Sequence, residues 1–234
     1  MAVKKLSNLK VSLLFFILFS IITFFDFGTM VNRTMRLLPN LAAIGILYFA
    51  YTPKIHKDSL QFLFFLLASA ITAFFYENPI FGILTLVFST IAYSIVGISA
   101  IKQLSKLKAS WFLRVYFFIT LLVLGYFLFE LTQLSKDQYD SYLQFILFNI
   151  GNLAIIFMLA GALLLVHQNP NQVAMVFLAF VIILILSEIS RAASYYSKTS
   201  VALFIYGSKV LYILALTLLI NCCGLIERQF VLKN

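Results

Sequence analysis

Charged residues are scarce in this chain of 234 residues. Asp, Glu, Lys and Arg make up 11% of the sequence and hydrophobic residues 63%, whereas ordinary soluble domains have about 25% charged and 45–50% apolar residues. The 17 basic and 8 acidic side chains cannot cover the surface of a soluble protein of this size. The composition therefore predicts an integral membrane protein, with residues 1–234 forming a single transmembrane domain.

Metal-binding and catalytic motifs are also lacking. The two cysteines, Cys222 and Cys223, are adjacent, so they can neither form a long-range disulfide nor supply four zinc ligands. His56 and His167 lack the neighbours that a metal site or a nucleophilic triad needs. The sequence contains no G-x-S-x-G, no H-E-x-x-H and no phosphate-binding glycine loop. We therefore expect neither a metal nor a cofactor.

Acidic residues are too few to balance the basic ones, and the formal net charge is +9. No basic run exceeds two residues, so we do not expect a nucleic-acid partner. In membrane proteins Lys and Arg concentrate in cytoplasmic loops. With the N-terminus inside, eleven basic residues fall on the cytoplasmic side and five on the outer side. This bias predicts that both termini are cytoplasmic.

Long apolar runs dominate the chain, and we expect them to form about eight transmembrane helices. The first follows Lys4, Lys5 and Lys10 without a signal-peptide cleavage site, so we expect it to be retained. The runs lack the alternation that β-strands of a membrane barrel require. An all-α, polytopic fold is therefore predicted, with spans at 11–27, 37–51, 60–76, 79–101, 111–131, 142–167, 173–190 and 202–223.

A few ionisable residues lie within these spans, where such residues are costly and usually functional. Glu188 and Arg191 are three positions apart, on one face of the seventh span. Lys209 in the eighth span lies at a similar depth below the outer surface, so Glu188 and Lys209 could pair. This set marks a candidate binding pocket, although a purely structural ion pair is an equal alternative.

Other polar residues near the outer ends of the spans could join the same pocket. They are Arg36, Pro39 and Asn40 in the second span, Asp26 after the first, and Glu130 in the fifth. Alternatively, Arg36, Asp26 and Glu130 extend to the lipid headgroups, and this alternative is favoured for the two acidic residues. Asn149 and Asn152 in the sixth span are expected to bond to neighbouring helices.

Short motifs occur in order in five of the spans: Arg36-Leu37-Leu38-Pro39, Ser69-Ala70-Ile71-Thr72-Ala73, Gly82 followed by Ser89-Thr90-Ile91-Ala92-Tyr93, Ser187-Glu188 and Tyr206-Gly207-Ser208-Lys209-Val210-Leu211. They resemble the bacterial YhhN and animal transmembrane-protein-86 family, whose characterised members are lysoplasmalogenases. The resemblance implies a protein of the bacterial inner membrane that acts on membrane lipids or lysolipids. It implies Glu188 as the catalytic residue, and as substrate-binding residues Arg36, Lys209, Arg191, Tyr206 and Tyr93.

The chain departs from the family pattern at three polar positions. Ala73 replaces an Asp, Thr90 a His and Lys209 a Gln, while Glu188 keeps the second acidic position. Hydrolysis of a vinyl ether needs an acid to protonate the alkenyl carbon and a polar group to direct water. Two hypotheses follow: a lysoplasmalogenase-type hydrolase that cleaves the vinyl-ether bond of a lysolipid, or a non-catalytic lipid-binding or transport protein that retains the fold.

Overall fold

The computed structural model describes residues 8–24, 36–104, 111–136, 141–196 and 202–233. Within these ranges the chain forms eight α-helices and no strand, which confirms the all-α prediction. Each predicted apolar segment corresponds to one helix. The helices are α1 (Asn8–Phe24), α3 (Leu37–Phe49), α4 (Lys57–Ala73), α5 (Pro79–Lys102), α6 (Trp111–Ser135), α7 (Tyr142–Gln168), α8 (Gln172–Tyr196) and α9 (Ala202–Lys233).

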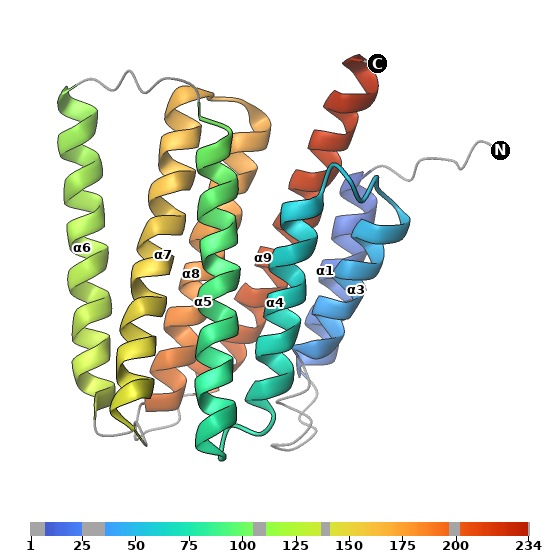
Figure 1. The fold of residues 1–234 in the computed structure, drawn as a ribbon. Coiled ribbons are helices and arrows are strands. Elements are labelled where there is room, and N and C mark those ends of the chain that lie inside the picture. The colour runs from blue at the N-terminus through green and yellow to red at the C-terminus, as the bar shows by residue number, and fades with distance from the viewer. Residues whose placement is uncertain (1–7, 25–35, 105–110, 137–140, 197–201, 234) are drawn as a thin grey trace.

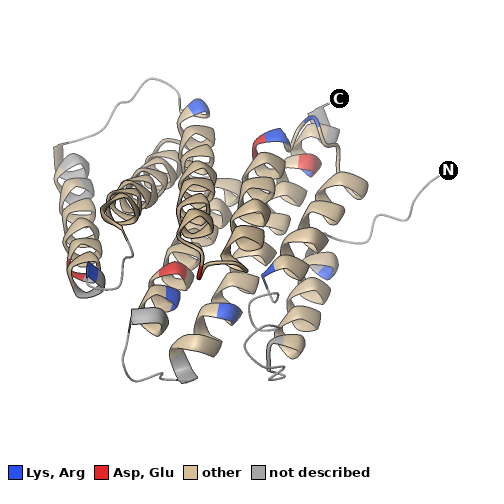
Figure 2. Cartoon of the chain, turned by 60° about the horizontal axis from the view of Figure 1, so that its bottom comes forward, with Lys and Arg blue, Asp and Glu red and all other residues tan. Residues whose placement is uncertain are grey.

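Four of the helices contain stretches long and apolar enough to cross a membrane: Pro79–Lys102, Tyr142–Gln168, Gln172–Ser194 and Phe204–Phe230. A crossing helix needs about 20 apolar residues. Three shorter apolar stretches fall below that length, namely Lys10–Ile22, Leu37–Phe49 and Phe118–Glu130. Charged residues are few and gather toward the two ends of the helices (Figure 2). The described structure thus has the character of an integral membrane protein.

Short polar side chains begin several helices at the breaks that the sequence predicts. The Asn78 side chain accepts a hydrogen bond from the Ile80 amide, 3.0 Å away, and Pro79 occupies the first helical position of α5. Ser141 caps α7 by accepting from the Gln144 amide at 3.2 Å. These caps satisfy backbone donors that a helix start leaves without an intrahelical acceptor.

The helices form an antiparallel bundle in which α1 begins and α9 ends at the same end (Figure 1). Helix α9 packs against α8, α1 and α3, while α5 packs between α4 and α7. Helix α6 lies at one edge and contacts α7 and α8 (Figure 1). Helices distant in sequence, such as α3 and α9, therefore become neighbours in the bundle.

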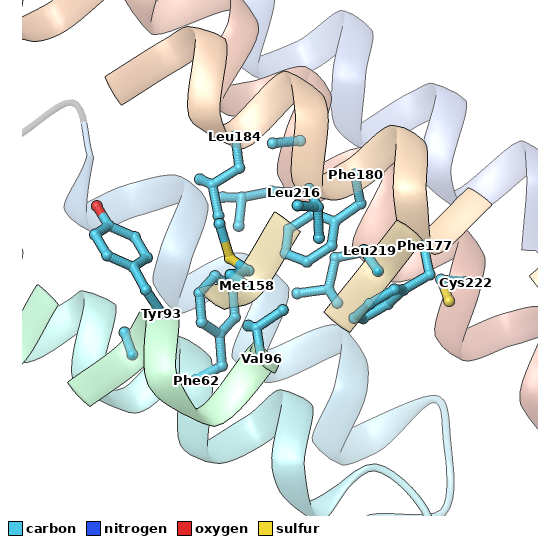
Figure 3. Close-up of a cluster of buried hydrophobic side chains, with 14 of the residues drawn as sticks. Phe62, Tyr93, Val96, Met158, Phe177, Phe180, Leu184, Leu216, Leu219 and Cys222 are labelled. Atoms are coloured by element: carbon cyan, nitrogen blue, oxygen red, sulfur yellow. The ribbon is translucent and has the colours of Figure 1, made fainter. Parts of the chain in front are cut away.

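The core lies between α4, α5, α7, α8 and α9 (Figure 3). The Phe62 and Phe180 rings meet edge to face with centroids 5.6 Å apart, and Met158 and Leu216 are completely buried beside them. Apolar burial does not by itself drive helices together in lipid, because lipid tails are equally apolar. Close packing of these side chains therefore fixes the arrangement.

Two glycines bring α5 and α7 into close approach. A Cβ atom added at Gly161 would lie 3.0 Å from the Ala100 Cβ and 3.1 Å from the Gly97 backbone oxygen. Neither of these atoms is the flexible end of a side chain. Small residues at helix contacts allow backbones to approach in this way, so glycine at position 161 is a packing requirement.

We predict that Gly161→Ala separates α5 from α7 and lowers the free energy of unfolding by about 1–3 kcal/mol, as overpacking does in tight cores. Thermal unfolding of the purified protein in detergent would measure the change. Gly45→Ala is the matched control, because a Cβ at Gly45 meets nothing within 4 Å. The same change there should leave stability unaltered or raise it by up to about 1 kcal/mol. Equal effects at the two positions would contradict the packing role.

At the end of the bundle where α9 ends, Glu227 ties α9 to the turn between α3 and α4. We call Thr52, His56 and Glu227 the latch. Thr52 Oγ1 donates to Glu227 Oε1 at 2.7 Å, and His56 Nε2 lies 3.2 Å from Glu227 Oε2. The Tyr51 ring lies against His56, with centroids 5.6 Å apart. No local sequence pattern indicates this contact, because its residues are more than 170 positions apart.

Burial of His56 makes the free energy of unfolding depend on pH. Burial lowers the pKa of His56 below its usual 6.5, an effect that the hydrogen bond to Glu227 partly opposes. An unfolded His56 would bind a proton near pH 6.5 while the folded one stays neutral. The free energy of unfolding is therefore greatest above pH 6.5, and it decreases as the pH drops below that value.

We expect the thermal midpoint of unfolding to fall between pH 7.5 and pH 5.5, and His56→Gln to flatten that slope. His167 is exposed, so His167→Gln should retain the slope of the unmodified protein. Parallel curves for the unmodified protein and His56→Gln would show that His56 does not titrate in this way.

Candidate functional site

Glu188, toward the end of α8, is held by two arginines. Its Oε1 accepts a hydrogen bond from Arg36 Nη1 at 3.1 Å, and its Oε2 accepts from Arg191 Nε at 3.0 Å. The Glu188 side chain is only 7% exposed, and a buried carboxylate requires partners of this kind. We call these three residues the ion triad. Because Arg36 immediately precedes α3, the triad joins α3 to α8.

The pair between Glu188 and Lys209 that their similar depth allowed does not form between the described side chains. Among the residues that the structure describes, the ion partners of Glu188 are Arg36 and Arg191. The Lys209 ammonium instead lies over the Tyr206 ring, 5.4 Å from its centroid. Similar depth in the membrane was the basis of the expectation, but depth does not specify which neighbour a side chain faces.

Tyr212 on α9 positions the start of α3. Its hydroxyl donates to Asn40 Oδ1 at 2.6 Å, and the Arg36 guanidinium lies over its ring, 4.7 Å from the centroid. Such a cation–π contact orients the guanidinium. Arg36 Nη2 is buried and has no acceptor in the described part of the chain. Tyr212 is not among the residues predicted for the site, although it lies about one helical turn beyond Lys209.

A cavity of about 250 Å³ opens beside the ion triad. Three of the predicted basic residues, Arg36, Arg191 and Lys209, line it, as does Tyr93. The Tyr93 hydroxyl points away from Met158 and Val96 of the core (Figure 3). The cavity thus gathers residues of the second, seventh and eighth spans. Tyr206 contacts Lys209 but is not among the lining residues.

Hydroxyl groups on α4 and α5 also line the cavity. The residues are Ser69, Thr85 and Ser89. Ser69 donates to the Thr85 carbonyl at 3.1 Å, Thr85 to the Phe81 carbonyl at 2.8 Å, and Ser89 to the Leu86 carbonyl at 3.0 Å. Because the single proton of each hydroxyl is engaged in this arrangement, the lone pairs of these groups remain for a ligand. We call them the acceptor wall.

A smaller chamber of about 50 Å³ adjoins the cavity. The two spaces share Ser89, Tyr93 and Arg191 as lining residues, and Glu188 and Thr90 line the chamber. The Thr90 hydroxyl is buried and has no partner in the described ranges. A space of this volume is large enough to hold water molecules, with Glu188 and Thr90 as polar partners in a largely apolar lining.

The remaining polar predictions have different outcomes. Asn152 bonds across helices, donating to Thr132 Oγ1 on α6 at 2.9 Å, as expected. Asn149 does not, because its side chain donates at 2.8 Å to the Phe145 carbonyl of its own helix. Glu130 is exposed on α6 and is not among the residues that line the cavity. Asp26 lies outside the described residues.

No three His, Cys, Asp or Glu side chains in the described ranges come together as metal ligands would. Cys222 and Cys223 are buried in α9 as free thiols. The groups that converge are instead cations and hydroxyls. Such a set suits an anion, because guanidinium and ammonium groups form strong charge-assisted hydrogen bonds with phosphate and carboxylate oxygens.

No protein-family model, curated protein or solved structure matches this chain. The family resemblance therefore rests on the motifs themselves, and the fold places them close together. Arg36, Ser69, Ala73 and Lys209 line the cavity, and Thr90 and Glu188 line the chamber beside it. Residues from five separate motifs thus surround one continuous region.

We predict that Glu188→Gln destabilises the protein by about 2–3 kcal/mol, because it leaves two guanidinium groups without their carboxylate. This loss is smaller than that for fully buried pairs, since Arg36 is 24% and Arg191 44% exposed. Unfolding in mixed micelles would measure the loss. Asp58→Asn is the control, because its pair with Lys102 is long, at 3.5 Å, and well exposed. That change should cost less than about 1 kcal/mol, and equal losses would contradict a structural role for the triad.

Proposed function

We propose that this membrane protein binds the phosphate-bearing head group of a lysolipid in the cavity. The observation that carries the proposal is the convergence of Arg36, Arg191 and Lys209 on one space within a bundle of apolar helices. Ionisable residues within apolar spans usually face a protein interior or a water-filled cavity and commonly mark a binding site. The volume of about 250 Å³ suits a polar head group rather than a whole lipid. The family resemblance supports a lysolipid as the class of ligand.

The ion triad favours binding without catalysis. Glu188 accepts hydrogen bonds from two guanidinium groups, which stabilise the ionised carboxylate. Protonation of an alkenyl carbon needs a carboxylic acid that holds its proton. Ala73 and Thr90, at the positions where the related family has Asp and His, provide no other acid. The triad therefore acts as a fixed support for the binding cations.

Hydrolysis of the vinyl-ether bond is the second candidate, and the small chamber is the observation in its favour. Glu188 and Thr90 line this space, which is large enough for water. A carboxylate oxygen can accept a hydrogen bond from water and orient it toward a ligand in the adjoining cavity. This candidate requires an acid from another source, and so it ranks below binding.

We further propose that all eight helices cross the bacterial inner membrane and that both termini face the cytoplasm. The excess of basic residues on one side supports this orientation. The start of α1 and the end of α9 lie at one end of the bundle, as an even number of crossings requires (Figure 1).

Binding can be tested with the purified protein in a non-ionic detergent, using a lysophospholipid that carries a fluorescent label on its acyl chain. We expect saturable binding that Lys209→Gln weakens about tenfold, as the loss of one charge-assisted hydrogen bond predicts. Lys102→Gln serves as the matched control, because Lys102 is 62% exposed and pairs with Asp58 away from the cavity. Equal affinity in the two variants would contradict the proposed site.

Catalysis can be tested by incubating the protein with a lysoplasmalogen and measuring the release of a fatty aldehyde. We expect binding of the lipid without aldehyde. Release of aldehyde that Glu188→Gln abolishes, while the variant still binds the lipid, would establish the hydrolase instead.

A further inference from the structure

Three polar groups in the lining of the small chamber have unused hydrogen-bonding capacity. Thr90 Oγ1 is buried and has no partner in the described ranges. Asn152 donates through Nδ2 to Thr132, and its Oδ1 has no donor among the described residues. The Tyr93 side chain is only 4% exposed, and its hydroxyl makes no hydrogen bond to a described residue. That hydroxyl points away from the apolar core (Figure 3).

Glu188 adds an acceptor to the same space. Its Oε1 accepts from Arg36, and its Oε2 accepts from Nε and Nη2 of Arg191. An ionised carboxylate has about four acceptor positions, so the three printed bonds leave one for a further donor. Two hydroxyl donors and two acceptors therefore line one small space. A water molecule matches this set, because it can accept two hydrogen bonds and donate two.

The chamber has room for water and offers these polar groups little else. Its volume is about 50 Å³, whereas one buried water needs roughly 10–15 Å³. Most of the remaining lining is apolar: Leu86, Leu128, Phe148, Ile155 and Ile189. Such side chains cannot satisfy a hydroxyl or an amide, and a buried polar group without a partner is unfavourable. Buried waters in proteins typically bond to polar groups in this situation.

Gly151 on α7 keeps the chamber open. It lines the chamber, and a Cβ atom added to it would lie 3.2 Å from Thr90 Oγ1. That separation is shorter than ordinary van der Waals contact. A side chain at this position would therefore occupy the space in front of the Thr90 hydroxyl, which glycine leaves for another atom.

We infer that the chamber binds at least one ordered water molecule, which accepts hydrogen bonds from Thr90 and Tyr93 and donates to Asn152 and Glu188. This water links α5, α7 and α8, and its site is independent of lysolipid binding. The chamber and the cavity share Ser89 and Tyr93 as lining residues. A ligand in the cavity can therefore contact Glu188 through this water, and this step alone rests on the proposed function.

Radiolytic hydroxyl-radical labelling in water enriched in oxygen-18 tests the site in the full-length, ligand-free protein. Radicals formed from an ordered water react with the side chains that contact it. Leu128 and Ile155 line the chamber but not the cavity, and Leu216 and Ile220 are fully buried core controls. We expect label on the two chamber residues and none on the two controls. Unlabelled chamber residues would show that the chamber is dry or filled by hydrocarbon, and would overturn the inference.

Gly151→Ala should remove the label from Leu128 and Ile155, because the added methyl group displaces the water. Gly45→Ala is the matched control, since a Cβ at Gly45 meets nothing within 4 Å, and it should retain the label. Label that persists in a folded Gly151→Ala protein would overturn the assigned site. Thermal unfolding identifies a variant that fails to fold.

Thr90→Val tests the same site by the sign of its effect and does not depend on the fate of Gly151→Ala. It replaces the hydroxyl by a methyl group of similar size. In a dry chamber this change removes an unpaired polar group and should raise the thermal midpoint of unfolding. With water bound it removes a hydrogen bond, and we expect the midpoint to fall by about 2–4 °C. An unchanged or raised midpoint would overturn the bond between Thr90 and the water.

Binding of the labelled lysolipid tests the link to the cavity. We expect Gly151→Ala to weaken it about tenfold, as the loss of one hydrogen bond predicts, and Gly45→Ala to leave it unchanged. Full affinity in a Gly151→Ala protein that has lost the chamber label would overturn the link while the water site stands. Failure of the unmodified protein to bind any lysolipid would overturn the proposed function, whereas label on Leu128 and Ile155 would still support the water site.

Discussion

The contact between the Glu188 carboxylate and two guanidinium groups is the constraint on which the rest of the site depends. A carboxylate buried among apolar helices needs compensating charge, and the chain supplies it from Arg191 on the same helix and from Arg36 at the start of α3. Satisfying one acidic side chain thus links the start of a short helix to α8. It also places two cations at the edge of a cavity. The contact of Glu188 with Arg36 and Arg191 therefore both links two helices and holds two guanidinium groups in the lining of the cavity.

Helix α9 holds both ends of α3 through polar contacts. Toward one end the Tyr212 hydroxyl bonds to Asn40, and beyond the other end Glu227 accepts hydrogen bonds from Thr52. Helix α3 has only 13 residues, and lipid provides little hydrophobic force to hold one apolar helix against another. Directional contacts to a long neighbour can supply the specificity that apolar burial does not. Because Arg36 immediately precedes α3, these contacts also help to determine where its guanidinium lies.

The charge balance of the cavity links the fold to the proposed ligand. An acid catalyst must carry a proton, whereas the triad carboxylate is stabilised in its ionised form. Ala73, Thr90 and Lys209 also line the cavity or its adjoining chamber, and none of them carries a carboxyl group. This set of side chains suits the proposed binding of an anion better than it suits proton transfer from a carboxylic acid.

The helices could be predicted from the sequence, because long apolar runs can satisfy their backbone hydrogen bonds in lipid only as helices. The charged residues within those runs could likewise be identified as candidates for the site. The starts at Asn78 and Ser141 follow from local capping, which depends on neighbours along the chain. The partners of the polar side chains follow only from the folded arrangement of the helices. In the structure Glu188 pairs with Arg36 rather than Lys209, Tyr212 donates a hydrogen bond to Asn40, and His56 lies beside Glu227. Composition and depth specify that a polar group lies within a span. Which helix it faces depends on the rotation and packing of every helix in the bundle, and no local pattern encodes that information.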